Sequence, residues 1–532
     1  MSDSSANKVP FGQKLAFGFG MLANQLFPAA LGVFFVLLID GGGFSPLLWG
    51  LLAFAPRIFD AITDPLMGFV SDNTRSKWGR RRQYVFVGAL MLGISYIFMW
   101  QLYGANGQAF NFWYFLGWSL VFYLGLTIFS VPYVAMGYEM SDDFHERTSI
   151  MAVGQFVGQW AWVLAPWLWV LVAHPMLFPN TTEQAFGLVD QMNNYAIEVV
   201  ETAPELATSF KESADALQLS SQNLVDEETI GPRGGDAELG VRVLAIWVAI
   251  PCTIFALIPA IFIRSKSTLD RNDLQPISMS TLGNSLADVF ISTVEAFKIP
   301  QFRKLAIATF LVFNTFEIIA SFTFLIIVHH LFNSDQGAAG IWPAMHGCIG
   351  ALITTFLVIP LVAYISKIIG KKKAFLLSQA ISIVGYILFW FLFIPGQPYL
   401  FLIALPFHSF GIGGLFTLMM SMTADVCDID ELNTGKRREG ILGAVYWWMV
   451  KFGKAFAGLA TGVILWFVGF AGADSSESAI VGIRLFYTLL PVTGVVLAIL
   501  VMWNYDITEE KAEEVRTQLQ KKKRDIKSLE DG

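Results

Sequence analysis

The chain is poor in charged residues, in cysteine and in recognisable enzyme motifs. Asp, Glu, Lys and Arg make up 14% of its 532 residues, against about 25% in a typical soluble domain. Its three cysteines, Cys252, Cys348 and Cys427, lie far apart in or beside apolar runs, which indicates neither a disulfide framework nor a metal site. There is no Gly-rich phosphate loop, metal-ligand cluster or nucleophile constellation, so we expect no enzyme and no cofactor. The N-terminus MSDSSANKVPFGQK also lacks the pattern of a cleaved signal peptide.

Apolar residues are abundant instead. They make up 55% of the chain, and phenylalanine alone occurs 47 times, which is more apolar surface than a soluble protein of this size could bury. About 20 apolar residues cross a bilayer as a helix. The sequence predicts an all-α polytopic membrane protein with twelve such runs: 11–39, 46–72, 84–102, 111–138, 150–173, 241–264, 301–332, 338–364, 374–393, 399–424, 439–470 and 479–504.

The basic residues set the expected orientation. Lys and Arg gather in the loops after spans 2, 8 and 10, in the connector after span 6 and in the tail, which all fall on one side if there are twelve spans. That side is then cytoplasmic, with both termini inside. The predicted organisation is an N-terminal bundle (1–174), an acidic extracytoplasmic insertion (175–240), span 6 (241–264), a cytoplasmic connector (265–300), a C-terminal bundle (301–504) and a basic cytoplasmic tail (505–532).

An internal repeat relates the two sets of six spans. PLMGFVSDNTRSKWGRRRQ (65–83) and PLVAYISKIIGKKKA (360–374) both run from a proline through a helix to a glycine and three basic residues, and both end the second span of a half. The second copy is shorter and lacks the acid. Two related six-span halves favour the major facilitator architecture, with a cavity between two bundles.

Two acids stand inside span 2. Asp60 and Asp64 are one helical turn apart and share a face with Arg57 and Thr63. Charged residues within a membrane usually face the protein interior and mark ion or solute paths. Two carboxylates and a hydroxyl suit a small cation such as Na⁺, and close carboxylates can instead share a proton. Alternatively, Arg57 neutralises one aspartate as a buried ion pair, which leaves the second acid unexplained.

Other polar residues within the spans are cavity candidates. Span 11 carries Trp447, Trp448 and Lys451 at helical spacing, with Lys454 one turn on, and the alternative is an interfacial belt with a snorkelling lysine. Span 7 carries Asn314 and Glu317, and Glu317 could pair with Lys451 across the cavity. Further candidates, which could equally be helix–helix contacts, are Gln25, Thr127, Ser130 and Tyr133.

Three segments carry a family resemblance. RIFDAITDPLMGFVSDNTRSKWGRRR (57–82), PYVAMGYEMSDDFHERTSI (132–150) and MTADVCDIDELNTGKRREGILGAVYWWMVKFGKAFAG (422–458) resemble the glycoside–pentoside–hexuronide:cation symporters, the family of the melibiose permease. The resemblance implies a cation site at Asp60 and Asp64 with Thr63 and Thr127 as neighbouring ligands. It also implies that Arg57 and Lys451 lie beside that site.

The resemblance fails at the sugar site. Melibiose permease has sugar-binding carboxylates where this chain has Gln25 and Ser130, and an arginine where it has Gln155. The resemblance therefore implies a Na⁺- or H⁺-coupled importer of a glycoside or other sugar derivative but not of a melibiose-like galactoside. The alternative is a lysolipid or other amphipathic solute.

The cytoplasmic loops complete the expected mechanism. We expect charge networks that hold the inside closed, built from Asp72, Arg80, Glu139, Arg147, Asp425 and Asp428. We further expect a monomer in a bacterial inner membrane, which handles a small solute and has no nucleic-acid partner.

Overall fold

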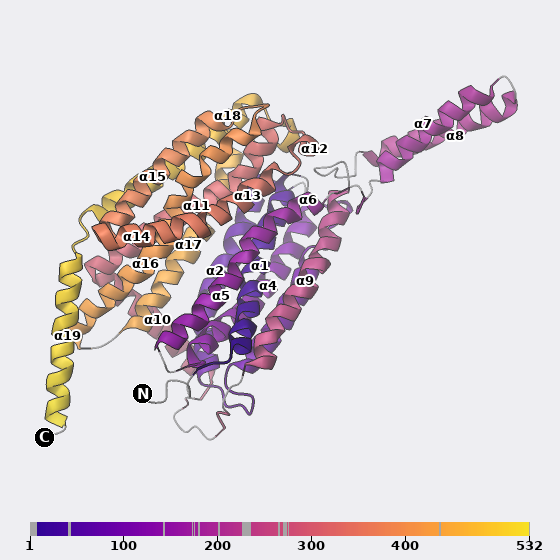
Figure 1. Ribbon diagram of the computed structural model, residues 1–532. Helices are drawn as coiled ribbons and strands as arrows, with labels where there is room; N and C mark the ends of the chain where they lie inside the picture. The colour runs from indigo at the N-terminus through magenta and orange to yellow at the C-terminus, as the bar shows by residue number, and fades with distance from the viewer. Residues whose placement is uncertain are drawn as a thin grey trace.

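The computed structural model describes residues 8–40, 44–141, 144–172, 174, 176–178, 181–200, 203–225, 236–263, 267–269, 274, 276–435 and 438–530. Within these ranges the regular elements are all helices, and twelve are long and apolar enough to cross a membrane. The predicted all-α fold class and the count of twelve spans are therefore confirmed. The helices form two bundles that lie side by side (Figure 1).

The first bundle, here the N-half, contains spans 1 to 6. Its elements are α1 (Phe11–Asp40), α2 (Pro46–Asp72), α3 (Arg82–Met99), η1 (Gly104–Asn106), α4 (Gln108–Glu139), α5 (Phe144–Leu164), η2 (Ala165–Trp167), α6 (Leu168–Val172) and α9 (Ala237–Phe262). The fifth span combines α5, η2 and α6, because Pro166 interrupts the regular helix.

The second bundle, here the C-half, contains spans 7 to 12. Its elements are α11 (Pro300–Leu325), η3 (Ile326–Leu331), α12 (Gln336–Ala339), α13 (Trp342–Ile353), η4 (Thr354–Val358), α14 (Ile359–Ile369), α15 (Lys371–Leu392), η5 (Pro398–Ile403), α16 (Leu405–Thr434), α17 (Glu439–Val468), η6 (Gly472–Asp474) and α18 (Glu477–Trp503). Span 10 departs furthest from its predicted range, since α16 continues ten residues past 424. That extra segment is polar in sequence but carries buried acids, among them Asp425 and Asp430.

The predicted insertion contains two helices. α7 (Thr181–Val199) and α8 (Pro204–Val225) pack against one another through small buried residues such as Ala196 and Ala214. This hairpin projects away from the bundles (Figure 1), so we call that end of the molecule the hairpin end.

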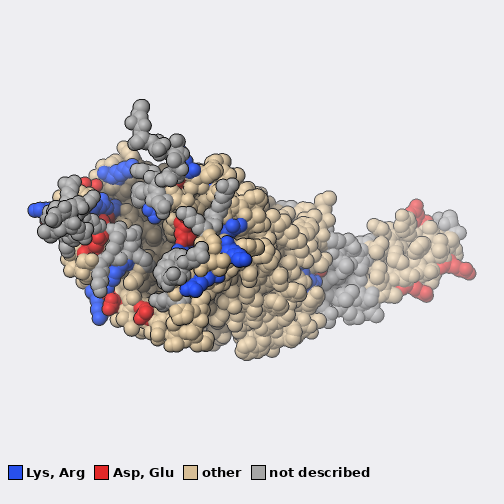
Figure 2. Space-filling view, turned by 90° about the horizontal axis from the view of Figure 1, so that it is seen from below, with Lys and Arg blue, Asp and Glu red and all other residues tan. Residues whose placement is uncertain are grey.

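The connector and the tail are also helical. α10 (Met279–Lys298) begins with a capping box at Ser278 and Thr281 and packs against α2 of the N-half and α17 of the C-half. α19 (Glu509–Glu530) packs against α16. Both chain termini lie at the end opposite the hairpin (Figure 1). Figure 2 looks onto that end, the basic face, and shows Lys and Arg side chains gathered around a hollow.

The two halves are packed closely at the hairpin end. Trp169 of α6 lies against Phe324 of α11, with ring centroids 4.3 Å apart, and donates to the Gly340 carbonyl at 3.2 Å. α2 and α17 approach through glycines: a Cβ on Gly462 would lie 2.5 Å from the Pro46 carbonyl oxygen. Small residues allow such backbone contact between membrane helices. The hollow therefore opens towards the basic face, while the hairpin end is sealed by direct packing.

Candidate functional site

Three helices bring the polar residues together midway along the spans. α2 supplies Arg57, Asp60 and Asp64, α4 supplies Thr127, and α17 supplies Lys451. Two prolines inside α2, Pro56 and Pro65, flank the acids and remove backbone donors from that stretch. α2 nevertheless runs as one continuous helix from Pro46 to Asp72, which holds both acids on a regular helical face. The segment is therefore suited to hold polar groups.

Both aspartates contact the same lysine. Lys451 Nζ lies 2.6 Å from Asp60 Oδ2 and also contacts Asp64 Oδ2. The other carboxylate oxygens face Thr127, whose Oγ1 lies 2.8 Å from Asp60 Oδ1 and 3.0 Å from Asp64 Oδ1. Thr63 Oγ1 is 3.0 Å from Thr127 Oγ1. The structure thus brings the four residues of the predicted cation site into one cluster around a cationic side chain of the opposite half.

The cluster is only partly shielded from solvent. The Asp60 side chain is 6% exposed, whereas Asp64 is 24% and Lys451 27% exposed. Asp64 and Lys451 are therefore the more accessible members of the cluster, and Asp60 is the more enclosed. Oxygen atoms of two carboxylates and two hydroxyls are the ligands that a hard cation prefers.

Arg57 does not neutralise an aspartate. Its Nη2 pairs with Glu317 Oε1 of α11 at 2.8 Å, and its Nη1 donates to the Lys454 carbonyl at 3.2 Å. Two alternatives that the sequence left open are therefore excluded: Arg57 is not the counter-ion of Asp60 or Asp64, and Glu317 does not pair with Lys451. The reason is geometric, since Lys451 reaches α2 from the facing helix and satisfies both acids itself.

A second group lies beside this pair. The Lys454 ammonium is 5.7 Å from the centre of the Trp162 ring, and the Trp162 indole donates to Gln25 Oε1 at 2.9 Å. Gln155 is exposed and lies two turns before Trp162, on the same face of α5. Sequence reasoning missed Trp162, because tryptophan is common at membrane interfaces and its spacing carried no signal.

The remaining cavity candidates fall in different places. Asn314 donates to the Gly453 carbonyl at 3.2 Å, a contact between α11 and α17. Ser130 is one turn beyond Thr127 on α4 and is partly exposed, and Trp447 is 49% exposed. Tyr133 is fully buried, donates to the Phe17 carbonyl and stacks on Phe17 and Phe129. Tyr133 is therefore a packing residue of the N-half, and its expected place in the cavity is wrong.

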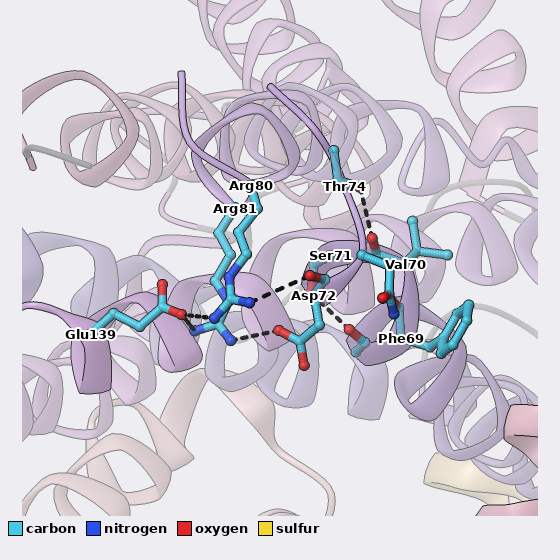
Figure 3. A network of polar contacts seen from close by, with 10 residues as sticks. Phe69, Val70, Ser71, Asp72, Thr74, Arg80, Arg81 and Glu139 are labelled. Carbon is cyan, nitrogen blue, oxygen red and sulfur yellow. Dashed lines mark hydrogen bonds and ion pairs between the residues drawn. The ribbon is translucent and has the colours of Figure 1, made fainter. Parts of the chain in front are cut away.

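Three of the four predicted gate residues of the N-half, Asp72, Arg80 and Glu139, form one network with Arg81 at the basic face (Figure 3). Arg81 contacts Asp72 at 2.6 Å and Glu139 at 3.2 Å, and Arg80 also contacts Glu139. Nearby, Lys14 pairs with Glu146 at 2.9 Å. Hydrogen bonds from Lys14 and from the Val9 backbone N–H hold the pKa of Glu146 below its ordinary value.

The C-half has its own network at the same face. Asp425 accepts from Lys371 at 2.6 Å and from Arg516 of α19 at 2.7 Å. Arg516 also lies 3.5 Å from Asp428. These pairs each join segments of a single half, as do those of the N-half. In this conformation the described gate pairs brace each half, whereas we expected them to close the inside between the halves.

Comparison with known proteins agrees with this architecture. The model of the MFS/sugar transport protein family matches residues 16–509. The chain belongs to this family. It is 27% identical to an uncharacterized symporter of Synechocystis sp., with 98% of each chain covered. It is 23% identical to the glucuronide carrier protein homolog of Escherichia coli, with 96% of this chain and 95% of that one covered.

A solved structure shows the same fold. The bacterial homolog of the human lysosomal transporter Spinster, in an inward-facing and unoccupied conformation, matches 96% of this chain and 97% of its own, with a TM-score of 0.59 and 14% identity. The family member described here is therefore an integral membrane transporter with the major facilitator fold and not an enzyme.

Proposed function

We propose that the protein is a secondary active symporter in which a Na⁺ ion or a proton binds at Asp60 and Asp64. The observation that carries the proposal is the position of Lys451, whose ammonium lies between both carboxylates. A side-chain cation of the opposite half stands where the coupling cation would bind. Lys451 offsets part of the negative charge of the two carboxylates in the empty carrier, and an arriving cation competes with it for the same oxygen atoms.

This competition links ion binding to movement of the halves. Asp60 and Asp64 belong to the N-half and Lys451 to the C-half, so their contact spans the interface. A cation that replaces Lys451 changes the attraction between the halves and so biases one conformation over another. The solute would bind beside this site, near Arg57 and Glu317, in the hollow that opens to the basic face.

The proposed solute is a small polar molecule, and a sugar derivative is the favoured class. The family description and the glucuronide carrier homolog support that class. Ionised side chains at the centre of the hollow oppose the lysolipid alternative, because an acyl chain gains nothing from contact with them. We place the basic face in the cytoplasm of a bacterial cell on the positive-inside rule, with a monomer as the working unit.

The test is cation-dependent thermal stability of the purified protein. Wild type, Asp60→Asn, Asp64→Asn and the control Asp190→Asn, an exposed acid of the hairpin, are melted in Na⁺, Li⁺ and K⁺ and across pH. A Na⁺-specific rise in Tm that both site variants lose and the control keeps supports Na⁺ coupling. A rise that depends on pH alone, and is lost in the same variants, supports proton coupling. If neither appears in wild type, the cation site is refuted.

A further inference from the structure

Lys454 differs from the other two basic residues at the centre. Lys451 contacts two carboxylates, and Arg57 contacts Glu317. Among the described residues, the Lys454 ammonium faces the Trp162 ring, whose centre is 5.7 Å away. Glu317 is near enough to attract it but is already paired with Arg57. The three positive side chains therefore divide the three carboxylates unequally. Lys454 has the weakest contact with a carboxylate.

A ring face alone does not compensate such a charge. A lysine at the centre of a membrane helix is costly to insert, and a cation–π contact returns only part of that cost. Water in the hollow can solvate the ammonium while the basic face is open. That solvation is removed when the halves close over the site, so a closed carrier needs another partner for Lys454.

The surroundings of Lys454 favour an anion. The Arg57 guanidinium lies against the same turn of α17, where it donates a hydrogen bond to the Lys454 carbonyl oxygen at 3.2 Å. Gln25 fixes the indole of Trp162 by accepting its N–H at 2.9 Å, and Trp162 in turn offers a flat face beside the ammonium. Two cations, an amide and an indole face held in neighbouring positions suit a solute with a carboxylate on a ring.

The charge count supports the same conclusion. Asp60, Asp64 and Glu317 balance Arg57, Lys451 and Lys454, so the empty centre has no net charge when all six are ionised. A bound cation alone makes it +1, and a bound monoanion alone makes it −1. Both half-loaded forms place a net charge at the middle of the bilayer, which is costly. The empty form and the form with both ligands are neutral.

We propose, building on the cation site above, that Lys454 binds the negatively charged group of an anionic solute and that cation and solute cross together without net charge movement. Coupling then follows from electrostatics, since the carrier closes readily when it holds both ligands or neither. A neutral sugar would leave the cation-loaded centre charged and would be transported poorly.

The experiment compares a matched pair of probes in the presence of Na⁺ at constant ionic strength and pH. Glucuronate and glucose differ in one carboxylate, and glucose 6-phosphate adds a second anionic probe. Tm is measured for wild type, Lys454→Gln, Lys454→Arg and the control Lys373→Gln, an exposed lysine at the start of α15. We expect at least one anion to raise the wild-type Tm by several degrees more than glucose. Lys454→Gln should abolish that difference, whereas Lys454→Arg and the control should retain it.

Two results overturn the inference. One is a wild type that does not distinguish either anion from glucose, and the other is a difference that survives in Lys454→Gln. The change in Tm with Na⁺ or pH, measured without solute, distinguishes the anion site from the cation site. If that change is present but the anions do not raise Tm, only the anion-site proposal is refuted. If that effect is absent from wild type, the proposed symport fails. The active anion is then followed into proteoliposomes, where uptake that depends on an imposed membrane potential would also contradict electroneutral transport.

Discussion

The N-half and the C-half carry opposite charges at the centre of the membrane. α2 of the N-half contributes Asp60, Asp64 and Arg57, while the C-half contributes Lys451, Lys454 and Glu317. With these six ionised, each half has an unpaired unit of charge, negative in one and positive in the other. The contacts cross over, from Lys451 to the aspartates and from Arg57 to Glu317. Neutrality is thus a property of the assembled pair of halves and depends on how closely they approach.

The halves also differ at the basic face. Asp72 ends α2 with its side chain 52% exposed and is held by Arg81 of the following loop. In the repeated segment of the C-half, Lys367 stands where Asp72 would be. The acid comes instead from α16 as Asp425, 4% exposed, and one of its two cations comes from the tail helix. The same task, bracing a half at its basic end, is met by a loop in one repeat and by the tail in the other.

The largest effect is expected from removing Lys451. Lys451→Ala leaves two carboxylates side by side without their cation, and breaking a buried ion pair costs about 3–5 kcal/mol. Tm in cation-free buffer should fall sharply, and the Na⁺- or pH-dependent rise in Tm should become larger than in wild type. Lys451→Arg retains the positive charge, so its Tm in cation-free buffer should lie between those of wild type and Lys451→Ala. An unchanged Tm in Lys451→Ala would contradict the role of this contact in joining the halves.

The next comparison separates the two partners of the second ion pair. Glu317→Gln leaves Arg57 and Lys454 together without a carboxylate, whereas Arg57→Gln leaves Glu317 beside Lys454. We expect destabilisation of about 3 kcal/mol for Glu317→Gln and about 1 kcal/mol for Arg57→Gln, because the latter keeps an available counter-ion. Denaturant melts of both single variants and the double variant measure the coupling energy. Equal losses would show that Lys454 does not lie within reach of Glu317.

A smaller difference is expected between the acids of the basic face. Asp425→Asn removes a buried carboxylate from two cations and should cost about 2–3 kcal/mol. Asp72→Asn removes a half-exposed carboxylate and should cost less than about 1 kcal/mol. Thermal melts of the purified variants at low and high salt check both values. If the order were reversed, the N-half loop would be the stronger brace.

The smallest effect is expected for the tail. Arg516 is 51% exposed, so Arg516→Ala should cost at most about 1 kcal/mol, and salt should weaken its contribution. Val515 and Leu519 remain buried against the C-half and should keep α19 in place. Limited proteolysis after α18 measures this directly. Rapid cleavage at the start of α19 in Arg516→Ala alone would show that the ion pair, and not the apolar contact, holds the tail.

Much of the fold could be predicted from the sequence, because membrane-spanning helices appear as long apolar runs. The acids of α2 could also be predicted as a site, since Asp60 and Asp64 share one helical face and an acid within a membrane span is costly and usually has a function. The sequence predicted that a basic residue would lie near these acids but not which one would contact them. Whether Lys451 or Arg57 reaches them depends on the rotation of α17 against α2, and no spacing within a single helix records that rotation.

Other errors have the same origin. Ser130 and Tyr133 lie one turn apart on the same side of α4, and the sequence does not say that Tyr133 packs on Phe17 of α1 instead of lining the cavity. Lys454 is one turn from Lys451 and looked secondary, although it points to a different neighbour, Trp162 on α5. The tail read as a solvated basic segment, because the buried partner of Arg516 lies on α16, 91 residues earlier in the chain.

The glycine contact at the hairpin end also sets mechanical distances. Gly50 and Gly462 touch near the start of α2, and a helix rises about 1.5 Å per residue, so Asp60 lies about 15 Å and Asp72 about 33 Å along the axis from that point. If the halves turn about this contact as a fulcrum, each 10° moves the ion site by about 3 Å and the basic end by about 6 Å. With this ratio, a small separation of Lys451 from its carboxylates would widen the basic end by about twice as much.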